Sequence, residues 1–367
     1  MVSGGLVAHS SFAETDPVSG SWRPKSYVGT YGTNGFHLDF SDASSLTSGS
    51  NAGLGKDSSG NGNYWTTNNI VLTDSVLDSP TNNFATLNPM DIVAGESVST
   101  FSNGSLSWNS ASSVNGTYSA RSTIAANSGK WYFETKVTTV GNTNDNLTVG
   151  IRTDDGQLRA MANRSLDIGY YKDGAYELVQ NRNPPWVVGD VVGMAFDTDN
   201  DTVSFTLNGN PFLTKTAQGL VGKTWIPFVS NTVTNGRAGF ATVSNFGQGG
   251  QSGLTYYSDA GGAFTHAPPT GFKALSTSKL PAPAIASPKS HFDILTWVGN
   301  STASARTVSG LGFTPDFVWS KARSLAYNHQ LYDSVRGVGK LLNSNIAGIE
   351  ATNFLYGYLS SFNSDGF

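Results

Sequence analysis

From about residue 100 onward, apolar and polar side chains alternate with the period of two that is typical of β-strands. In KWYFETKV, Trp131 and Phe133 belong to one face of the expected strand, and Tyr132 and Glu134 belong to the other. The segment TVSFTLN alternates in the same way and ends at an Asn-Gly dipeptide, a common hairpin turn. Similar short segments follow, and none has the 3.6-residue period of a helix. The pattern predicts an all-β chain with an antiparallel β-sandwich.

The same pattern divides the chain into four parts. Residues 1–99 combine an extended arm with a turn-rich β segment, whose apolar residues are too sparse for a core of their own. Residues 100–275 form the expected sandwich, and residues 276–290 are a linker that several prolines stiffen. Residues 291–367 begin a further β module that ends at SFNSDGF without a partner strand. Either this last module is completed by another chain, or the chain is a fragment of a longer polypeptide. We favour the fragment, with the last module incomplete.

Composition supports a folded, turn-rich β protein and excludes several other classes. The 367 residues are enough for roughly two or three domains. Charged residues make up 13% and aromatic residues 11%, which argues against disorder. The formal net charge of −4 gives no basic footprint for nucleic acid. The sequence has no cysteine, which excludes disulfides, thiolate metal sites and thiol catalysis.

No segment is apolar for long enough to span a membrane, so we expect no membrane insertion. The first residues, MVSGGLVAHSSFAET, lack the basic start and apolar core of a secretory signal.

Five short motifs occur in the order found in one known family. They are GKWYFETKV, VGI at 149–151, GYYKDGAY at 169–176, the GD-VG strand with its Asp-rich and Asn-Gly turns at 189–212, and WIPFVS at 225–230. This series resembles the SPRY (B30.2-like) domain family. The resemblance covers about residues 100–275 and implies a concanavalin-like sandwich of jelly-roll type, flanked by smaller β-rich segments.

The segments around the sandwich resemble a narrower group. LGKDSSGNGNYWTTNN, DSPTNNFATLNP, HAPPTGFKAL, PDFVW, YDSVRG and SFNSDGF are similar to segments of virion-associated proteins of marine tailed bacteriophages. In that group a SPRY-like module is part of a longer tail or fibre polypeptide. The group often has a lectin-like domain upstream of a segment like SWRPKSYVGTYG, which here lies close to the N-terminus.

The Asp-rich turn is the strongest candidate for a metal site. Asp197, Asp199 and Asp201 have the spacing of the first ligands of a calcium loop. That loop also needs a bend glycine and a terminal glutamate, and this chain has Thr202 and Asn208 there. We interpret the segment as a polar turn, with a weak Ca²⁺ site as the alternative.

Acid–base chemistry has few candidate residues in this sequence. The chain contains five Glu, and Glu134 alone falls in a regular strand, where the SPRY resemblance makes it a structural hydrogen-bonding residue. Most Asp residues occur in turn sequences, and no His has a partner at metal-ligand spacing. We therefore expect a protein that is not an enzyme and that needs no cofactor.

Aromatic residues beside Asn and Asp favour a binding surface in the loops after the GYYKDG motif. The candidate residues are Trp186, Tyr171, Asp173, Asn181 and Asn183. Aromatic faces next to neutral hydrogen-bonding groups suit recognition of a sugar or a peptide. The alternative is that these aromatic side chains pack against the edge of the sandwich.

Together these features predict a non-enzymatic component of a phage tail or fibre, assembled in the host bacterial cytoplasm and located in the virion. Its expected partners are other virion proteins, a host-surface glycan or protein, and further copies of itself, with a trimer expected by analogy with fibres. Two alternatives remain. One is a subunit of a surface-polysaccharide depolymerase. The other is a free SPRY adaptor that binds peptides.

Overall fold

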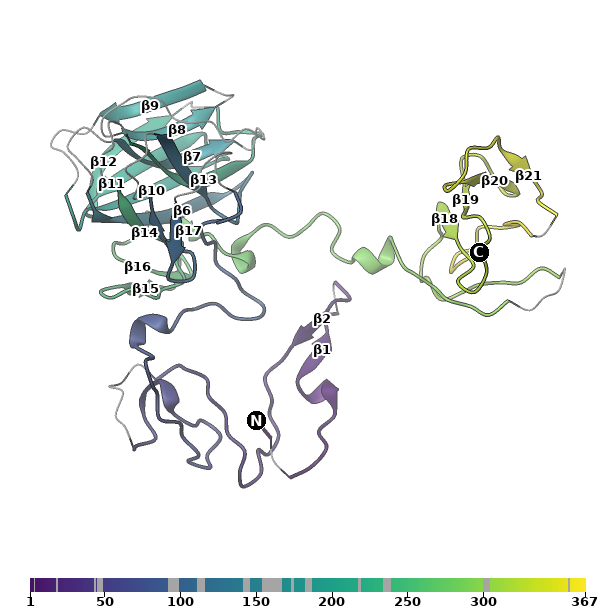
Figure 1. The fold of residues 1–367 in the computed structure, drawn as a ribbon, viewed down its shortest axis with the longest axis horizontal. Helices are drawn as coiled ribbons and strands as arrows, with labels where there is room; N and C mark the ends of the chain where they lie inside the picture. The colour runs from purple at the N-terminus through teal and green to yellow at the C-terminus, as the bar shows by residue number, and fades with distance from the viewer. Residues whose placement is uncertain are drawn as a thin grey trace. The chain divides into compact units, whose positions relative to one another are not determined.

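The computed structural model describes all residues except 3, 18, 43, 45–48, 92–98, 111–115, 141–145, 154–166, 173–174, 182–186, 217–218, 234–238, 300–303 and 356. The described residues form strands joined by turns and a few short 3-10 helices, with no α-helix among them (Figure 1). This confirms the all-β prediction. The residues divide into two compact units, one of 1–12 with 26–281 and the other of 13–25 with 282–367. The four-part division expected from the sequence stays a prediction.

One sheet of the sandwich has eight strands in the order β12-β11-β10-β6-β14-β4-β3, with β17 beside β6. Every pairing in it is antiparallel except β17 with β6. Its strands are β3 (Thr100–Ser102), β4 (Ser107–Asn109), β6 (Lys130–Thr139), β10 (Val191–Asp197), β11 (Thr202–Leu207), β12 (Asn210–Thr216), β14 (Ala241–Asn245) and β17 (Lys273–Ala274).

The second sheet has five strands in the order β5-β13-β7-β8-β9. They are β5 (Gly116–Arg121), β7 (Asn146–Thr153), β8 (Asp167–Lys172), β9 (Ala175–Asn181) and β13 (Trp225–Val233). The pair β7–β8 is parallel, whereas the other pairings are antiparallel. A parallel pair cannot be joined by the two-residue turn that joins an antiparallel hairpin.

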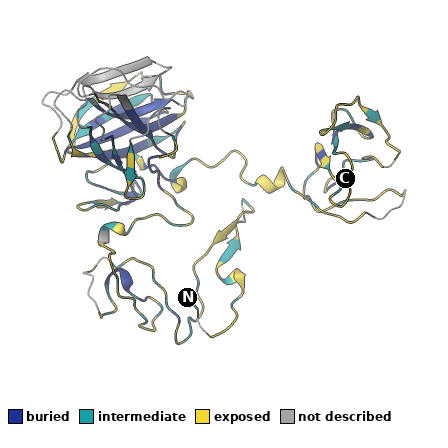
Figure 2. Cartoon of the chain, viewed as in Figure 1, coloured by how far each residue is buried: buried dark blue, intermediate teal, exposed yellow. Residues whose placement is uncertain are grey.

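The two sheets enclose the main core (Figure 2). As the alternation predicts, Trp131 and Phe133 of β6 are buried in it. They share it with Val149 and Ile151 of β7 and with Trp225 at the start of β13. Burying a side chain of this size stabilises the fold by about 1.5–3 kcal/mol.

A second, smaller core covers the outer face of β6. Tyr132 lies there against Phe264, with ring centroids 5.0 Å apart. Phe264 ends the hairpin of β15 (Thr255–Tyr257) and β16 (Gly262–Phe264). On the neighbouring β10, a Cβ at Gly193 would lie 2.3 Å from the hydroxyl oxygen of Tyr132, so only glycine fits there. Both faces of β6 are therefore buried from Trp131 to Thr135.

The segment before β3 also packs on the sandwich. Phe84, Ala85 and Leu87 are buried, and the amide of Ala85 donates to the carbonyl of Leu275. Further toward the N-terminus the elements are short: η1 (His9–Ser11), β1 (Ala13–Thr15), β2 (Trp22–Pro24), η2 (Gly53–Gly55) and η3 (Leu72–Asp74).

The second unit contains a small four-stranded sheet in the order β18-β19-β20-β21. Its strands are β18 (Phe317–Ser320), β19 (Gln330–Asp333), β20 (Lys340–Asn343) and β21 (Ala351–Thr352). One face of this sheet holds a core of Val318, Tyr332, Leu341 and Leu359. The proline-rich chain before it contains only the 3-10 turns η4 (Thr277–Lys279) and η5 (Pro288–Ser290).

Candidate functional site

The predicted binding residues follow β8 and β9 along the chain. Asp173, Asn183 and Trp186 lie outside the described residues. Tyr171 and Asn181 lie in β8 and β9, and the structure describes only their backbone.

The register of β8 and β9 separates these residues into two groups. Tyr171 pairs with Tyr176 beside the hairpin turn, whereas Asn181 pairs with Asp167 at the far end of the strands. The five-residue step from Tyr176 to Asn181 corresponds to about 17 Å of strand. Tyr171 therefore belongs to one end of the sheet, and Asn181 belongs to the other.

The connection from β9 to β10 exposes two apolar side chains. Val187 and Val188 follow Trp186 in the sequence, and their side chains are 57% and 65% exposed. This connection thus presents an exposed apolar pair, whereas Val221 is the one other exposed large apolar residue among the described side chains of 130–242.

A buried carboxylate holds this connection in place. Asp190 is 3% exposed, and its Oδ2 accepts the amide of Val187 at 2.9 Å. Its Oδ1 accepts Nδ2 of Asn208 at 3.0 Å, while Oδ1 of Asn208 accepts the amide of Val191 at 2.8 Å. Asn208 has a φ of +51° in the Asn-Gly turn, a conformation that Asn tolerates well. The apolar pair is therefore carried on a rigid turn. The sequence analysis had missed both roles, and the only sequence signal was an Asp directly ahead of a strand.

The first carboxylate of the Asp-rich turn is occupied by hydrogen bonds. Oδ1 of Asp197 accepts the amides of Asp199 and Asn200 at 3.1 and 2.9 Å. Its Oδ2 accepts Nδ2 of Asn200 at 2.8 Å and lies 3.2 Å from Nζ of Lys130. Burial opposes ionisation, but the bonds from Asn200 and Lys130 outweigh it and keep the pKa of Asp197 below its usual value.

The other two carboxylates of this turn accept backbone amides from other segments of the chain. Oδ1 of Asp199 accepts the amide of Gly129 at 3.0 Å. Asp201 accepts the amides of Gly219 and Leu220 at 2.9 and 2.6 Å. Among the described residues, no three His, Cys, Asp or Glu side chains gather as ligands for a metal ion. The geometry supports the interpretation of the segment as a polar turn that ties three loops together.

Glu134 has the structural role that the SPRY resemblance implied. It is 1% exposed, and its two oxygens accept the amides of Thr265 and His266, each at 2.8 Å. Oε1 also accepts the hydroxyl of Tyr132 at 3.1 Å. Burial, together with the nearby Glu134, raises the pKa of Tyr132 far above its usual range. Because Glu134 is closed off from solvent, it anchors the segment after β16 to the sheet.

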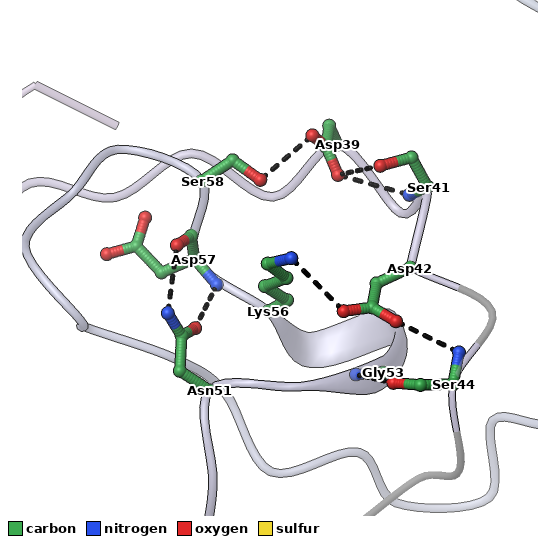
Figure 3. Close-up of polar contacts among 9 residues, drawn as sticks. All are labelled: Asp39, Ser41, Asp42, Ser44, Asn51, Gly53, Lys56, Asp57 and Ser58. Atoms are coloured by element: carbon green, nitrogen blue, oxygen red, sulfur yellow. Dashed lines mark hydrogen bonds and ion pairs between the residues drawn. The ribbon is translucent and has the colours of Figure 1, made fainter.

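A further polar cluster is built around Asp57, within the DSSGNGN segment (Figure 3). Asp57 is 2% exposed, and its carboxylate accepts the amides of His37, Ser59 and Asn63 and the hydroxyl of Ser59. The side chain of Asn51 bonds to both the amide and the carbonyl of Asp57. The hydrogen bonds lower the pKa of Asp57 against the opposing effect of burial.

Neighbouring side chains extend this cluster. Asp42 pairs with Lys56 at 3.2 Å, and its bonds to Ser44, with the help of Lys56, lower its pKa to about 2. Nδ2 of Asn61 donates to the carbonyls of Gly32 and Gly35. The cluster therefore shapes a turn-rich segment without a strand ladder. A hollow of about 580 Å³ lies beside it, lined by residues 29–33 with Ser59 and Asn61.

Comparison with protein families gives two matches. Residues 130–242 match the model of the SPRY domain. Residues 287–367 match a domain of unknown function, DUF7483. A comparison with curated proteins found no match.

Solved structures include SPRY domains with a partial likeness to this chain. The SPRY domain of human HERC1 is 16% identical, with a TM-score of 0.33, over 43% of this chain and 96% of that domain. The PSpry domain of TRIM65 is 14% identical, with a TM-score of 0.31, over 44% of this chain and 92% of that domain.

No helix in the described part of the chain is long and apolar enough to cross a membrane.

The family match lies on the strands that build the sandwich, from β6 through β14. It coincides with the motif order found in the sequence, from GKWYFETKV to WIPFVS. The middle of this chain is therefore a SPRY domain, followed by a second module that matches a family of unknown function.

Proposed function

We propose that the SPRY domain of this chain is a non-enzymatic binding module and that it binds its partner at the β9–β10 connection. The observation that carries this proposal is the exposed pair Val187–Val188 on a turn held by Asp190 and Asn208. An apolar pair on a rigid support loses little conformational entropy when a partner covers it. Trp186 comes directly before this pair in the sequence and would enlarge the contact.

Two further points support a binding role. SPRY domains are generally binding modules rather than enzymes. The described carboxylates of the domain also serve the fold, since Glu134, Asp190, Asp197, Asp199 and Asp201 all accept backbone amides. Acid–base hydrolysis of a glycoside would instead need two carboxyl groups facing a shared cleft.

We further propose that the chain is a component of the tail or fibre of a tailed bacteriophage. Its partner there is a host-surface protein or glycan, or a neighbouring virion protein. The support is the resemblance of the segments around the SPRY domain to virion-associated proteins, together with the low charge and the lack of cysteine. Quantitative peptide mass spectrometry of purified particles tests this context. We expect a few to some tens of copies per particle, and absence from particles would refute the virion assignment.

A paired substitution tests the binding site. Val187→Asp with Val188→Asp places charge on the proposed contact, so adsorption of the purified chain to host cells should weaken about a hundredfold. Val221→Asp is the matched control, because Val221 is 60% exposed and lies in another loop. Both variants should melt at the wild-type temperature. Equal adsorption by the two variants would refute the pair as the contact with the host surface, whatever the mass spectrometry shows.

A further inference from the structure

Exposed apolar side chains are concentrated in the last module of the chain. Among the described residues of 287–367, fifteen large apolar side chains are exposed, whereas its core has only a few members. The exposed set is Phe292, Ile294, Trp297, Val298, Phe317, Trp319, Leu325, Tyr327, Val335, Val338, Ile346, Ile349, Phe354, Leu355 and Tyr358. Exposed apolar side chains mark an interaction surface where they lie together on one face.

Strand β18 is the most ordered part of this surface. Its side chains alternate, with Val318 buried in the core and Phe317 and Trp319 exposed by 55% and 61% on the opposite face. The register continues that face through Leu331 of β19 to Leu342 of β20. The sheet thus has one face on its core and an apolar row on the other.

The ring of Trp319 is held in place within the chain. Its indole Nε1 donates to Nδ1 of His329 at 3.3 Å, and the two ring centroids lie 5.8 Å apart. The aromatic surface is therefore ordered before any partner covers it, which lowers the entropic cost of association.

Strand β18 also lies at the edge of its sheet. Within the described part of the chain it pairs with β19 on one side, and no strand or isolated bridge pairs with its other side. An open edge with apolar residues and no charge is a template for pairing with another strand. Pro315 and Lys321 flank the strand, so they restrict such pairing to the segment between them.

We propose that a second copy of this chain pairs with β18, antiparallel and with a two-fold axis at Val318. Paired residues of antiparallel strands share a face, so this register places each Phe317 beside Trp319 of the second copy. It also places Val318 against Val318 and continues both small cores. The two sheets then form one eight-stranded sheet.

Charge favours a second copy over an acidic or basic partner. Residues 287–367 contain six Lys and Arg and five Asp and Glu, a net charge of +1. Near the open face, Asp333 pairs with Arg336, and Lys340 lies 3.8 Å from Glu350, so little charge remains unbalanced. Asp316 precedes β18 and Lys321 follows it, so antiparallel copies bring opposite charges to each end of the contact. The inference goes beyond the binding role of the SPRY domain and does not depend on it.

Sedimentation of the full chain tests the association. We expect a reversible dimer whose dissociation constant rises about a hundredfold in Phe317→Lys with Trp319→Lys, because like charges then face each other. Ile349→Lys is the matched control, since Ile349 is 95% exposed but lies outside β18, and it should leave the dimer unchanged. A chain that stays monomeric at high concentration, or a dimer or trimer that survives the double substitution, would overturn the proposal.

A cross-link tests the register and covers the case in which the Lys variants misfold. The chain has no cysteine, so Val318→Cys introduces one thiol. Opposed residues of antiparallel strands have Cα atoms about 4.5–5.5 Å apart, a distance that a disulfide spans. Mild oxidation should link Val318→Cys into a covalent dimer but should leave Ile349→Cys unlinked. The opposite result would refute pairing at β18.

Discussion

The SPRY domain and the C-terminal module use the same alternation of side chains with opposite results. In the SPRY domain, β6 buries Trp131 on one face and Tyr132 on the other. In the C-terminal module, β18 buries Val318 and exposes Trp319. Figure 2 shows the contrast as a band of buried residues in the sandwich and mostly intermediate or exposed residues in the strands of the C-terminal sheet.

The difference comes from the number of layers that cover each sheet. The eight-stranded sheet has the five-stranded sheet on one face and the β15–β16 hairpin on part of the other. The sheet of β18–β21 has a small core on one face only. A sheet with an apolar second face needs another layer or another molecule to cover it. The SPRY domain therefore buries both faces of β6 around Trp131 and Tyr132, whereas the C-terminal sheet leaves Phe317 and Trp319 exposed.

The largest expected difference in stability is between two tryptophan substitutions, one in each region. Trp131→Ala removes a side chain that is 1% exposed from the main core, so the free energy of unfolding should fall by about 3–5 kcal/mol. Trp319→Ala removes a side chain that is 61% exposed and should change the stability of the monomer by at most about 0.5 kcal/mol. Urea unfolding at low protein concentration measures both. A comparable loss in the two variants would break the comparison.

A smaller effect is expected where the outer face of the sandwich leaves no room. Gly193→Ala places a Cβ 2.3 Å from the hydroxyl oxygen of Tyr132 and 2.4 Å from Oγ1 of Thr206. Both atoms must shift, so the free energy of unfolding should fall by about 1–3 kcal/mol. Gly348→Ala in the C-terminal module is the control, because no atom lies within 4 Å of the added Cβ. If both variants keep wild-type melting temperatures, the outer face of β10 is not closely packed.

The smallest effect concerns acid stability. A carboxyl group whose pKa is lower in the folded state than in the unfolded state stabilises the fold at pH values above its unfolded pKa of 3.8. This stabilisation is lost as the pH falls through the folded-state pKa. Asp197 is such a group, so wild-type stability should decline as the pH drops below about 4. Asp197→Asn should be less stable at pH 7 and should lose less stability on acidification. Urea midpoints at pH 7 and pH 3 provide the measurement, and parallel declines would rule out a contribution from Asp197.

Much of the fold was predictable from local pattern. Alternation in β6 identified the buried faces, because its main-core members Trp131 and Phe133 occupy every second position. The parallel pair β7–β8 was not predictable, since side-chain alternation along a strand does not specify the direction of its neighbour. Asp190 was also missed, because its partners, the amide of Val187 and the side chain of Asn208, meet only when β10 and β11 pair.

By itself, the sequence determined the all-β class, the SPRY motif order and the polar nature of the Asp-rich turn, because these depend on neighbouring residues and on strand period. Only the tertiary structure decided which apolar side chains remain exposed. Val187 and Trp319 are apolar residues like those in the cores, and their exposure depends on which layers of the molecule cover them. Local pattern decides which face a side chain occupies, whereas burial depends on contacts between segments that are distant in the chain.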